Sequence, residues 1–223
     1  MKIKFEELKP QELQGIIDST GIVYLPLGTL EWHERHLPLG LDSLVAYELC
    51  IKSCEKTGGC VMPPFYFGTD REHNVQGKIL HGIDAKVGKI MTGSVYFLEP
   101  ELFLNLLNRV AKNLSEQRFR KLVIVSAHSG SAQQDVLEEL GKEQFKNMEL
   151  IILPGKMFAG GIDHAAEKET GLMMSVNSSL VNLENLKEPF EGILGDNPLN
   201  ATKEKGEEHF RSIVEQIVKI VGQ

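Results

Sequence analysis

The chain of 223 residues has a formal net charge of −7 and lacks any long run of lysine or arginine. This length can bury one sizeable core, so we expect a single domain over residues 1–223. The acidic balance argues against nucleic acid or an anionic membrane as the main partner and favours a small-molecule ligand. No window approaches the roughly 20 apolar residues of a membrane span, and no apolar signal segment opens the sequence, which predicts a cytoplasmic protein.

Apolar runs bounded by turn residues alternate with helical patterns along the chain, which is typical of βαβ units around a mainly parallel sheet. We expect strands at 22–27, 60–62, 122–127 and 149–153. We expect helices at 43–56, from Pro100 onward, at 131–145 and at 203–221. The pattern therefore predicts an α/β fold whose helices cover the faces of a central sheet.

Apolar periodicity gives an expected inner face for two of these helices. In the helix opened by Pro100, the four-residue spacing points to Leu102, Leu106, Val110 and Leu114. In the C-terminal helix it points to Phe210, Ile213, Ile217 and Ile220. The segment 64–95 is too long and too aromatic for a simple connection, and we expect it to help form a pocket wall.

Three cysteines, Cys50, Cys54 and Cys60, lie around the first predicted helix. An odd number in one cluster fits reduced, buried thiols better than a disulfide framework. A metal site built on these cysteines is the weaker alternative, because the cluster has no neighbouring histidine and no C-x-x-C spacing.

Histidines and carboxylates follow three of the predicted strands, where sites of α/β proteins are built. The loop after 22–27 contains Glu31, His33, His36 and Asp42, and His128 follows the strand 122–127 directly. A third group, Asp163, His164, Glu167 and Glu169, follows the strand 149–153 and a glycine-rich stretch. Zn²⁺ and Mn²⁺ bind such mixtures of imidazole and carboxylate, so we expect a metal site at this edge.

Three ordered motifs in this chain resemble those of the creatininase (creatinine amidohydrolase) family. The first is Gly28-x-x-Glu31-x-His33-x-x-His36-Leu-Pro-Leu-Gly-x-Asp42. The others are His128-x-Gly130 after a strand, and His164-Ala-x-x-x-Glu169-Thr170. The resemblance extends over about residues 22 to 175.

The resemblance implies a three-layer α/β/α sandwich, a ring-like homo-oligomer that is often a hexamer, and a site with two divalent ions, zinc or manganese, with iron possible. By position in the motifs, Glu31 and His128 would bind one ion, His33 the other, and Asp42 would bridge them. The family carboxylate on the second ion comes two residues after the metal-binding histidine, where this chain has Gly130. Glu169 is the replacement that we expect.

The resemblance also suggests roles around the metal. His164 would donate a proton to the leaving nitrogen or stabilise the tetrahedral oxyanion, oriented by a neighbouring carboxylate that Asp163 can supply. His73, Glu34 and Ser129 are candidates for substrate contact. The alternatives are a solvated ion pair of Glu34 with Arg35 and a loop-supporting role for His73.

Two departures from the family concern the surroundings of the metal. Glu34-Arg35 replaces a common Gly-Pro, and the chain has neither the tyrosine beside the metal-binding histidine nor a tryptophan near His164. Creatinine is therefore not the expected substrate. We expect a hydrolase that uses a metal-bridged hydroxide on a carbonyl C–N bond of a cyclic amide or formamide. The alternatives are a ring-opening hydrolase of a polyol-derived ketone and a catalytically silent assembly protein of the same fold.

Overall fold

A computed structural model describes residues 2–158 and 160–223 of the chain. Its centre is a four-stranded sheet in the order β2-β1-β5-β6. All three neighbouring pairs are parallel. The strands are β1 (Ile22–Leu27), β2 (Cys60–Val61), β5 (Lys121–Ser126) and β6 (Glu149–Pro154). The expected α/β fold with a mainly parallel sheet is confirmed.

The register of the sheet brings three strand ends to one edge. Leu27 at the end of β1 pairs with Ser126 at the end of β5, and Ser126 pairs with Pro154 at the end of β6. The loops that leave these strands therefore start side by side, as expected at the carboxyl edge of a parallel sheet.

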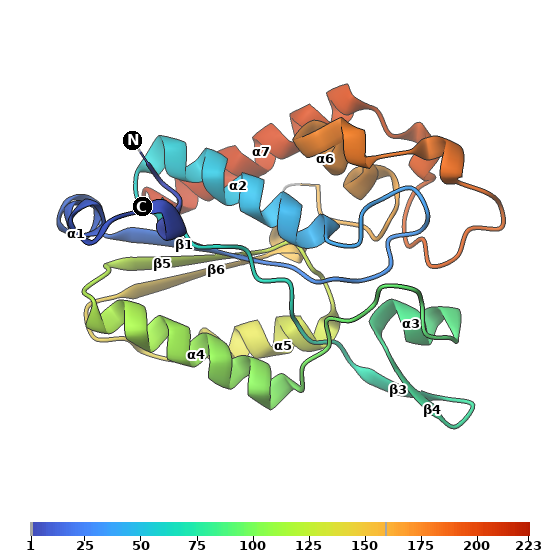
Figure 1. The fold of residues 1–223 in the computed structure, drawn as a ribbon, viewed down its shortest axis with the longest axis horizontal. Helices are drawn as coiled ribbons and strands as arrows, with labels where there is room; N and C mark the ends of the chain where they lie inside the picture. The colour runs from blue at the N-terminus through green and yellow to red at the C-terminus, as the bar shows by residue number, and fades with distance from the viewer. Residues whose placement is uncertain (1, 159) are drawn as a thin grey trace.

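Helices cover both faces of the sheet and give three layers (Figure 1). One face carries α2 (Leu41–Thr57), α6 (Glu167–Asn177) and α7 (Lys203–Val221), and the other carries α4 (Pro100–Glu116) and α5 (Ser131–Leu140). Helix α1 (Pro10–Ser19) adds Ile16 and Ile17 to the second core. Single 3-10 turns lie at Phe5–Glu7, Gly155–Met157, Ser178–Leu180, Leu183–Asn185 and Pro198–Asn200.

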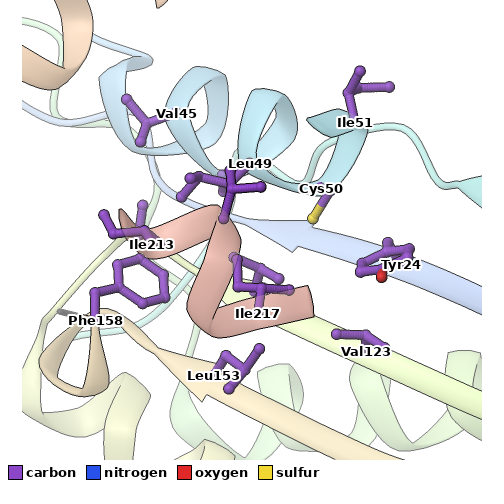
Figure 2. Close-up of a cluster of buried hydrophobic side chains, with 14 of the residues drawn as sticks. Tyr24, Val45, Leu49, Cys50, Ile51, Val123, Leu153, Phe158, Ile213 and Ile217 are labelled. Atoms are coloured by element: carbon purple, nitrogen blue, oxygen red, sulfur yellow. The ribbon is translucent and has the colours of Figure 1, made fainter. Parts of the chain in front are cut away.

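The first core lies between α2, α7 and the sheet (Figure 2). Ile213 and Ile217 of α7 are buried there beside Leu49 of α2, as the periodicity predicted. Burying each such side chain stabilises the fold by about 1.5–3 kcal/mol. Phe210 and Ile220 are partly buried at the edge of the same core.

The inner face expected for α4 is wrong. Leu102 and Leu106 are 52% and 38% exposed, whereas the buried side chains are Phe103, Leu107, Ala111 and Leu114. The observed face also begins with two four-residue steps, from Phe103 to Leu107 and Ala111, and the three-residue step to Leu114 offsets the drift of roughly 40° per four-residue step in a helix of 3.6 residues per turn. Only Leu114 belongs to both the expected and the observed face.

The segment 64–95 contains a hairpin and a short helix that protrude beside the main layers (Figure 1). Strands β3 (Glu72–Val75) and β4 (Lys78–His81) pair antiparallel, and α3 (Gly82–Val87) follows directly. The helix packs back on both strands of the hairpin.

Cys50, Cys54 and Cys60 are free and buried, as expected for reduced thiols. Burial raises the pKa of each thiol, so all three remain protonated at neutral pH. None of the helices in the described part of the chain is long and apolar enough to cross a membrane.

Candidate metal centre

Gly28 allows the first site loop and helix α2 to approach each other closely. A Cβ atom at this position would lie 2.2 Å from the backbone nitrogen of Ser43, a distance that no side chain tolerates. The close approach places Asp42, in the first turn of α2, under the loop that carries Glu31 and His33.

The five expected metal ligands converge in one buried cluster. The two oxygens of Asp42 face different partners: Oδ1 lies 3.2 Å from His33 Nε2, and Oδ2 lies 3.2 Å from His128 Nδ1. Glu31 Oε1 lies 2.9 Å from His128 Nδ1, and Glu169 Oε2 lies 3.7 Å from His33 Nε2. Asp42 is thus central, with one histidine and one further carboxylate on each side.

Three groups of side chains present ligand atoms within 4.8 Å of one another: Glu31, Asp42 and His128; His33, Asp42 and Glu169; and Glu31, His33 and His164. The first two groups share Asp42. Oxygen and imidazole ligands in this number suit Zn²⁺ or Mn²⁺, so the residues present fit the metals that the motifs imply.

Mutual interactions shift the pKa values within the cluster strongly. Burial alone would raise the pKa of Asp42, but the neighbouring His33 and His128 hold it well below its ordinary value. Burial alone would lower the pKa of His33, but Asp42 raises it to about 10, and Glu31 likewise raises that of His128. Without metal, protonated imidazoles therefore balance the buried carboxylates.

Contacts behind the cluster orient its members. Thr29 Oγ1 donates a hydrogen bond to Asp42 Oδ2 at 2.6 Å, and the backbone N–H of Ala165 donates to Glu169 Oε2 at 2.7 Å. His33 Nδ1 donates to the carbonyl oxygen of Glu31 at 3.1 Å, so its Nε2 faces the carboxylates. In metal sites, a hydrogen bond from the other ring nitrogen fixes the orientation and the tautomer of a metal-binding histidine.

His164 lies next to the cluster, with Nδ1 3.8 Å from Glu31 Oε1. Its Nε2 donates to the carbonyl oxygen of Trp32 at 2.9 Å. Burial and the nearby His33 lower the pKa of His164 to about 4. Asp163, the expected partner of this ring, instead accepts hydrogen bonds from the backbone N–H groups of Lys168 and Glu169 at the start of α6.

A cavity of about 900 Å³ opens over the cluster. Most of the residues that the sequence put forward line it: Glu31, His73, Asp42, His128, Ser129, Asp163, His164 and Glu169. His33 lies fully buried beneath, in contact with Asp42, and does not line it.

Glu34 lies outside the cavity and is only 3% exposed, so a solvated pair with Arg35 does not describe it. Its Oε2 accepts a hydrogen bond from the backbone N–H of Glu191 at 2.6 Å. Trp32 Nε1 donates to the carbonyl oxygen of Glu191 at 3.1 Å. Both side chains connect the loop that contains Glu31 and His33 to the distant segment around Glu191.

The sequence reasoning missed several groups at the site. Asp70 lines the cavity, with Oδ2 3.8 Å from His128 Nε2, and Thr29 binds the central carboxylate. Lys86 of α3 also lines the cavity. Asp70 and Lys86 both belong to the segment 64–95 that was expected to form a pocket wall, and Thr29 occupies an unspecified position of the first motif.

Comparisons with known proteins agree with the motifs. The family model described as Creatininase: Creatinine amidohydrolase matches residues 6–221. A curated relative, the creatinine amidohydrolase of Pseudomonas putida, is 23% identical over 186 residues, which span 73% of this chain and 67% of the relative.

Solved creatininase structures share the fold. A manganese form has a TM-score of 0.77 at 20% identity and covers 99% of this chain and 98% of its own. A creatininase variant of the Zn–Zn type has a TM-score of 0.76 at 20% identity, and the match covers 99% of this chain and 97% of the chain of that structure. With nearly the whole chain matched by the family model, the resemblance is confirmed, and the protein belongs to the creatininase family.

Proposed function

We propose that the protein is a metal-dependent amidohydrolase that cleaves the carbonyl C–N bond of a cyclic amide or formamide-type small molecule. The observation that carries this proposal is the position of Asp42 between two ligand groups, each with its own histidine and a further carboxylate. Membership of the creatininase family supports amide hydrolysis, and zinc and manganese forms of creatininase support the choice of metal.

In this proposal Glu31, Asp42 and His128 hold one divalent cation, and His33, Asp42 and Glu169 hold the other. Divalent cations held by these residues would lower the pKa of a bound water from 15.7 toward about 7 and so would supply hydroxide at neutral pH. Zinc and manganese are the expected metals, and iron also accepts this mixture of ligands.

Glu169 is assigned to the second ion because Gly130 leaves no room for a carboxylate. A Cβ atom at Gly130 would lie 2.4 Å from His128 Nε2 and 2.8 Å from Asp70 Oδ2. Glu169 approaches from helix α6 on the opposite side, beside His33, and is buried. Burial raises the pKa of Glu169 well above its ordinary value, and a cation would stabilise its charged form.

His164 is the group that moves a proton in this proposal. A carbonyl oxygen can only accept, so the neutral ring carries its proton on Nε2 toward Trp32, and the Nδ1 lone pair faces the Glu31 side. With a pKa near 4 the ring is neutral at pH 7. Nδ1 can therefore take a proton from the attacking water and return it to the leaving nitrogen.

The test combines metal analysis with a substrate screen. Protein reconstituted with Zn²⁺ or Mn²⁺ should contain two metal ions per chain and hydrolyse members of a panel of lactams, cyclic ureides and formamides. A panel of cyclic polyol-derived ketones tests the ring-opening alternative in parallel. Metal content well below one equivalent, or full amide turnover by an Asp42→Asn variant, would contradict the proposal.

A further inference from the structure

The cavity has two walls of different character. One wall is the cluster of candidate metal ligands at the carboxyl edge of the sheet. The opposite wall comes from the hairpin and α3, which protrude beside the main layers (Figure 1). This second wall contributes Arg71, His73, Asn74, Val75, Ile83, Ala85 and Lys86.

The cationic side chains of the second wall are available to a ligand. In the described parts of the chain, no carboxylate oxygen lies within 4.0 Å of the Lys86 ammonium group, so this charge is not neutralised by an ion pair. Arg71 pairs with Asp135 at 2.9 Å, but the two side chains are 59% and 63% exposed. Pairs exposed to this degree contribute at most about 1 kcal/mol, so the guanidinium can exchange Asp135 for a bound anion.

Helix α5 adds positive potential to the same space. Ser129, Gly130 and Ser131 line the cavity, and Ser131 is the first residue of this ten-residue helix. Gly130 is the N-cap and provides no side chain to accept from the first-turn N–H groups. The positive end of the helix dipole therefore faces the cavity, but the Asp70 carboxylate already lies beside it, with Oδ2 2.8 Å from the position of a Cβ atom at Gly130. The anion site therefore rests on Lys86 and Arg71.

The size of the cavity indicates a substrate that reaches both walls. Pockets of about 300–1,000 Å³ hold drug-sized ligands. A cavity of about 900 Å³ is therefore larger than a single five-membered ring requires. An amide placed at the metal wall leaves room for a substituent that extends to Lys86.

We propose that the substrate is an amide extended by an oxyanion group, a carboxylate or a phosphate, which Lys86 and Arg71 bind at the wall opposite the metal centre. The inference rests on the proposed function only in placing the amide at the metal wall. Charge-assisted hydrogen bonds from an ammonium and a guanidinium suit both kinds of oxyanion.

The test compares three linear formamides of similar length on the metal-loaded enzyme. N-propylformamide is neutral, N-formyl-β-alanine carries a carboxylate, and N-formyl-O-phosphoethanolamine carries a phosphate. Calorimetry gives the Kd of each, independent of turnover, and release of formate gives kcat/KM. The proteins are the wild type, Lys86→Met, Arg71→Gln and the control Lys78→Met, which removes an exposed charge from the same hairpin outside the cavity lining.

We expect the wild type to bind at least one anionic formamide about tenfold more tightly than the neutral one, and Lys86→Met to abolish that preference. Lys78→Met should retain it, and circular dichroism with metal analysis should show all variants folded and loaded. Whichever anionic formamide binds more tightly, the carboxylate or the phosphate compound, identifies the oxyanion that the site prefers. Three results would overturn the inference: an equal loss of the preference for the anionic formamide in Lys78→Met and Lys86→Met, no such preference in the wild type, or no binding of any of the three formamides.

The outcomes separate this inference from the proposed function. Binding that depends on Lys86 without release of formate supports the anion site and counts against amide hydrolysis of these probes. Hydrolysis without any dependence on Lys86 supports amide hydrolysis and overturns the anion site.

Discussion

Asp42 is the residue on which both candidate ions depend, because its two oxygens face His33 on one side and His128 on the other. We predict that Asp42→Asn loses both metal ions, whereas His33→Ala loses mainly one. Elemental analysis after reconstitution and removal of free metal measures the difference. The bridge assignment would be wrong if both variants lost the same amount.

A matched control for Asp42→Asn is available in Asp84→Asn. Asp84 is also a buried aspartate, but it accepts a hydrogen bond from Ser94 Oγ at 2.9 Å and belongs to none of the candidate metal groups. This variant should retain both ions. Loss of metal there would show that an altered buried carboxylate alone disturbs the centre.

His164→Asn tests the proton-transfer role. We predict that the variant keeps its metal and loses roughly 10²–10⁴-fold in kcat on an amide substrate, the usual contribution of a positioned acid or base. The loss should fall on kcat more than on KM, because the proton moves in the transition state.

The rival role for His164 is that of a ligand, since its Nδ1 belongs to a third candidate group with Glu31 and His33. Metal analysis of the same variant decides between the two roles. Loss of one equivalent would make His164 a ligand, and the proton carrier would then have to be another cavity residue.

At the scale of single residues, the sequence could predict which side chains come together in the candidate metal centre, but not all of the contacts that position them. Glu31, Asp42 and His128 meet because strand ends of a parallel sheet share an edge, which motif order reveals. Trp32 offers its backbone carbonyl to His164, a contact that no side-chain pattern records. Glu34 is buried by a segment more than 150 residues away, which spacing within a motif cannot show.

At the scale of elements, α6 positions Glu169 in the candidate metal centre and packs closely against α7 at Gly171 and Gly206. A Cβ atom at Gly206 would lie 1.8 Å from the carbonyl oxygen of Gly171. We predict that Gly206→Ala lowers the free energy of unfolding by about 1–3 kcal/mol or more, because backbone must move. Since α6 would shift, the second ion should also bind more weakly.

Gly15→Ala is the matched control for this glycine substitution. Nothing lies within 4 Å of a Cβ atom at Gly15, which is in helix α1. Alanine there should stabilise the protein by about 0.5–1 kcal/mol. Thermal unfolding and metal titration of both variants check the pair, and equal effects of the two substitutions would contradict the packing argument.

The elements also show where sequence patterns mislead. The strands β1 and β5 are continuous apolar runs and could be placed almost to the residue, because both faces of a parallel sheet are covered. The hairpin 72–81 has few apolar residues, and three positions of β3 and two of β4 are exposed. No apolar periodicity therefore marked it in the sequence. Its packing depends on α3, which is itself only six residues long.

At the scale of the whole molecule, exposed apolar side chains gather in the segment around the hairpin. Ile79, Val95 and Ile90 are 55%, 66% and 72% exposed. The prediction of a homo-oligomer larger than a dimer rests on the family resemblance, and these side chains are candidates for the contact between subunits. Light scattering at micromolar concentration measures the mass, and a monomer of 24.9 kDa would contradict the prediction.

The charge balance of the whole cluster predicts that metal binding releases protons. In the metal-free protein the carboxylates raise the pKa of His33 to about 10 and that of His128 well above its ordinary value, so both rings are protonated at pH 7.5. A cation can bind only the unprotonated rings, so each ion must displace a proton and affinity should rise with pH. Calorimetric titration in buffers of different ionisation enthalpy should detect about two protons released per chain from the imidazoles, and a further release from Glu169, whose pKa burial also raises.

Stability should depend on pH in opposite directions with and without metal. A histidine whose pKa is raised on folding stabilises the metal-free protein fully below its unfolded pKa near 6.5, and this contribution is lost as the pH rises to about 10. Bound metal stabilises the native state more as its affinity increases, so the metal-loaded protein should gain stability from pH 6 to pH 8 while the metal-free protein loses it. Thermal unfolding of both forms from pH 6 to pH 8 checks whether their stabilities change in opposite directions. Metal uptake without proton release would contradict the argument, because the imidazoles would then already be neutral in the metal-free protein.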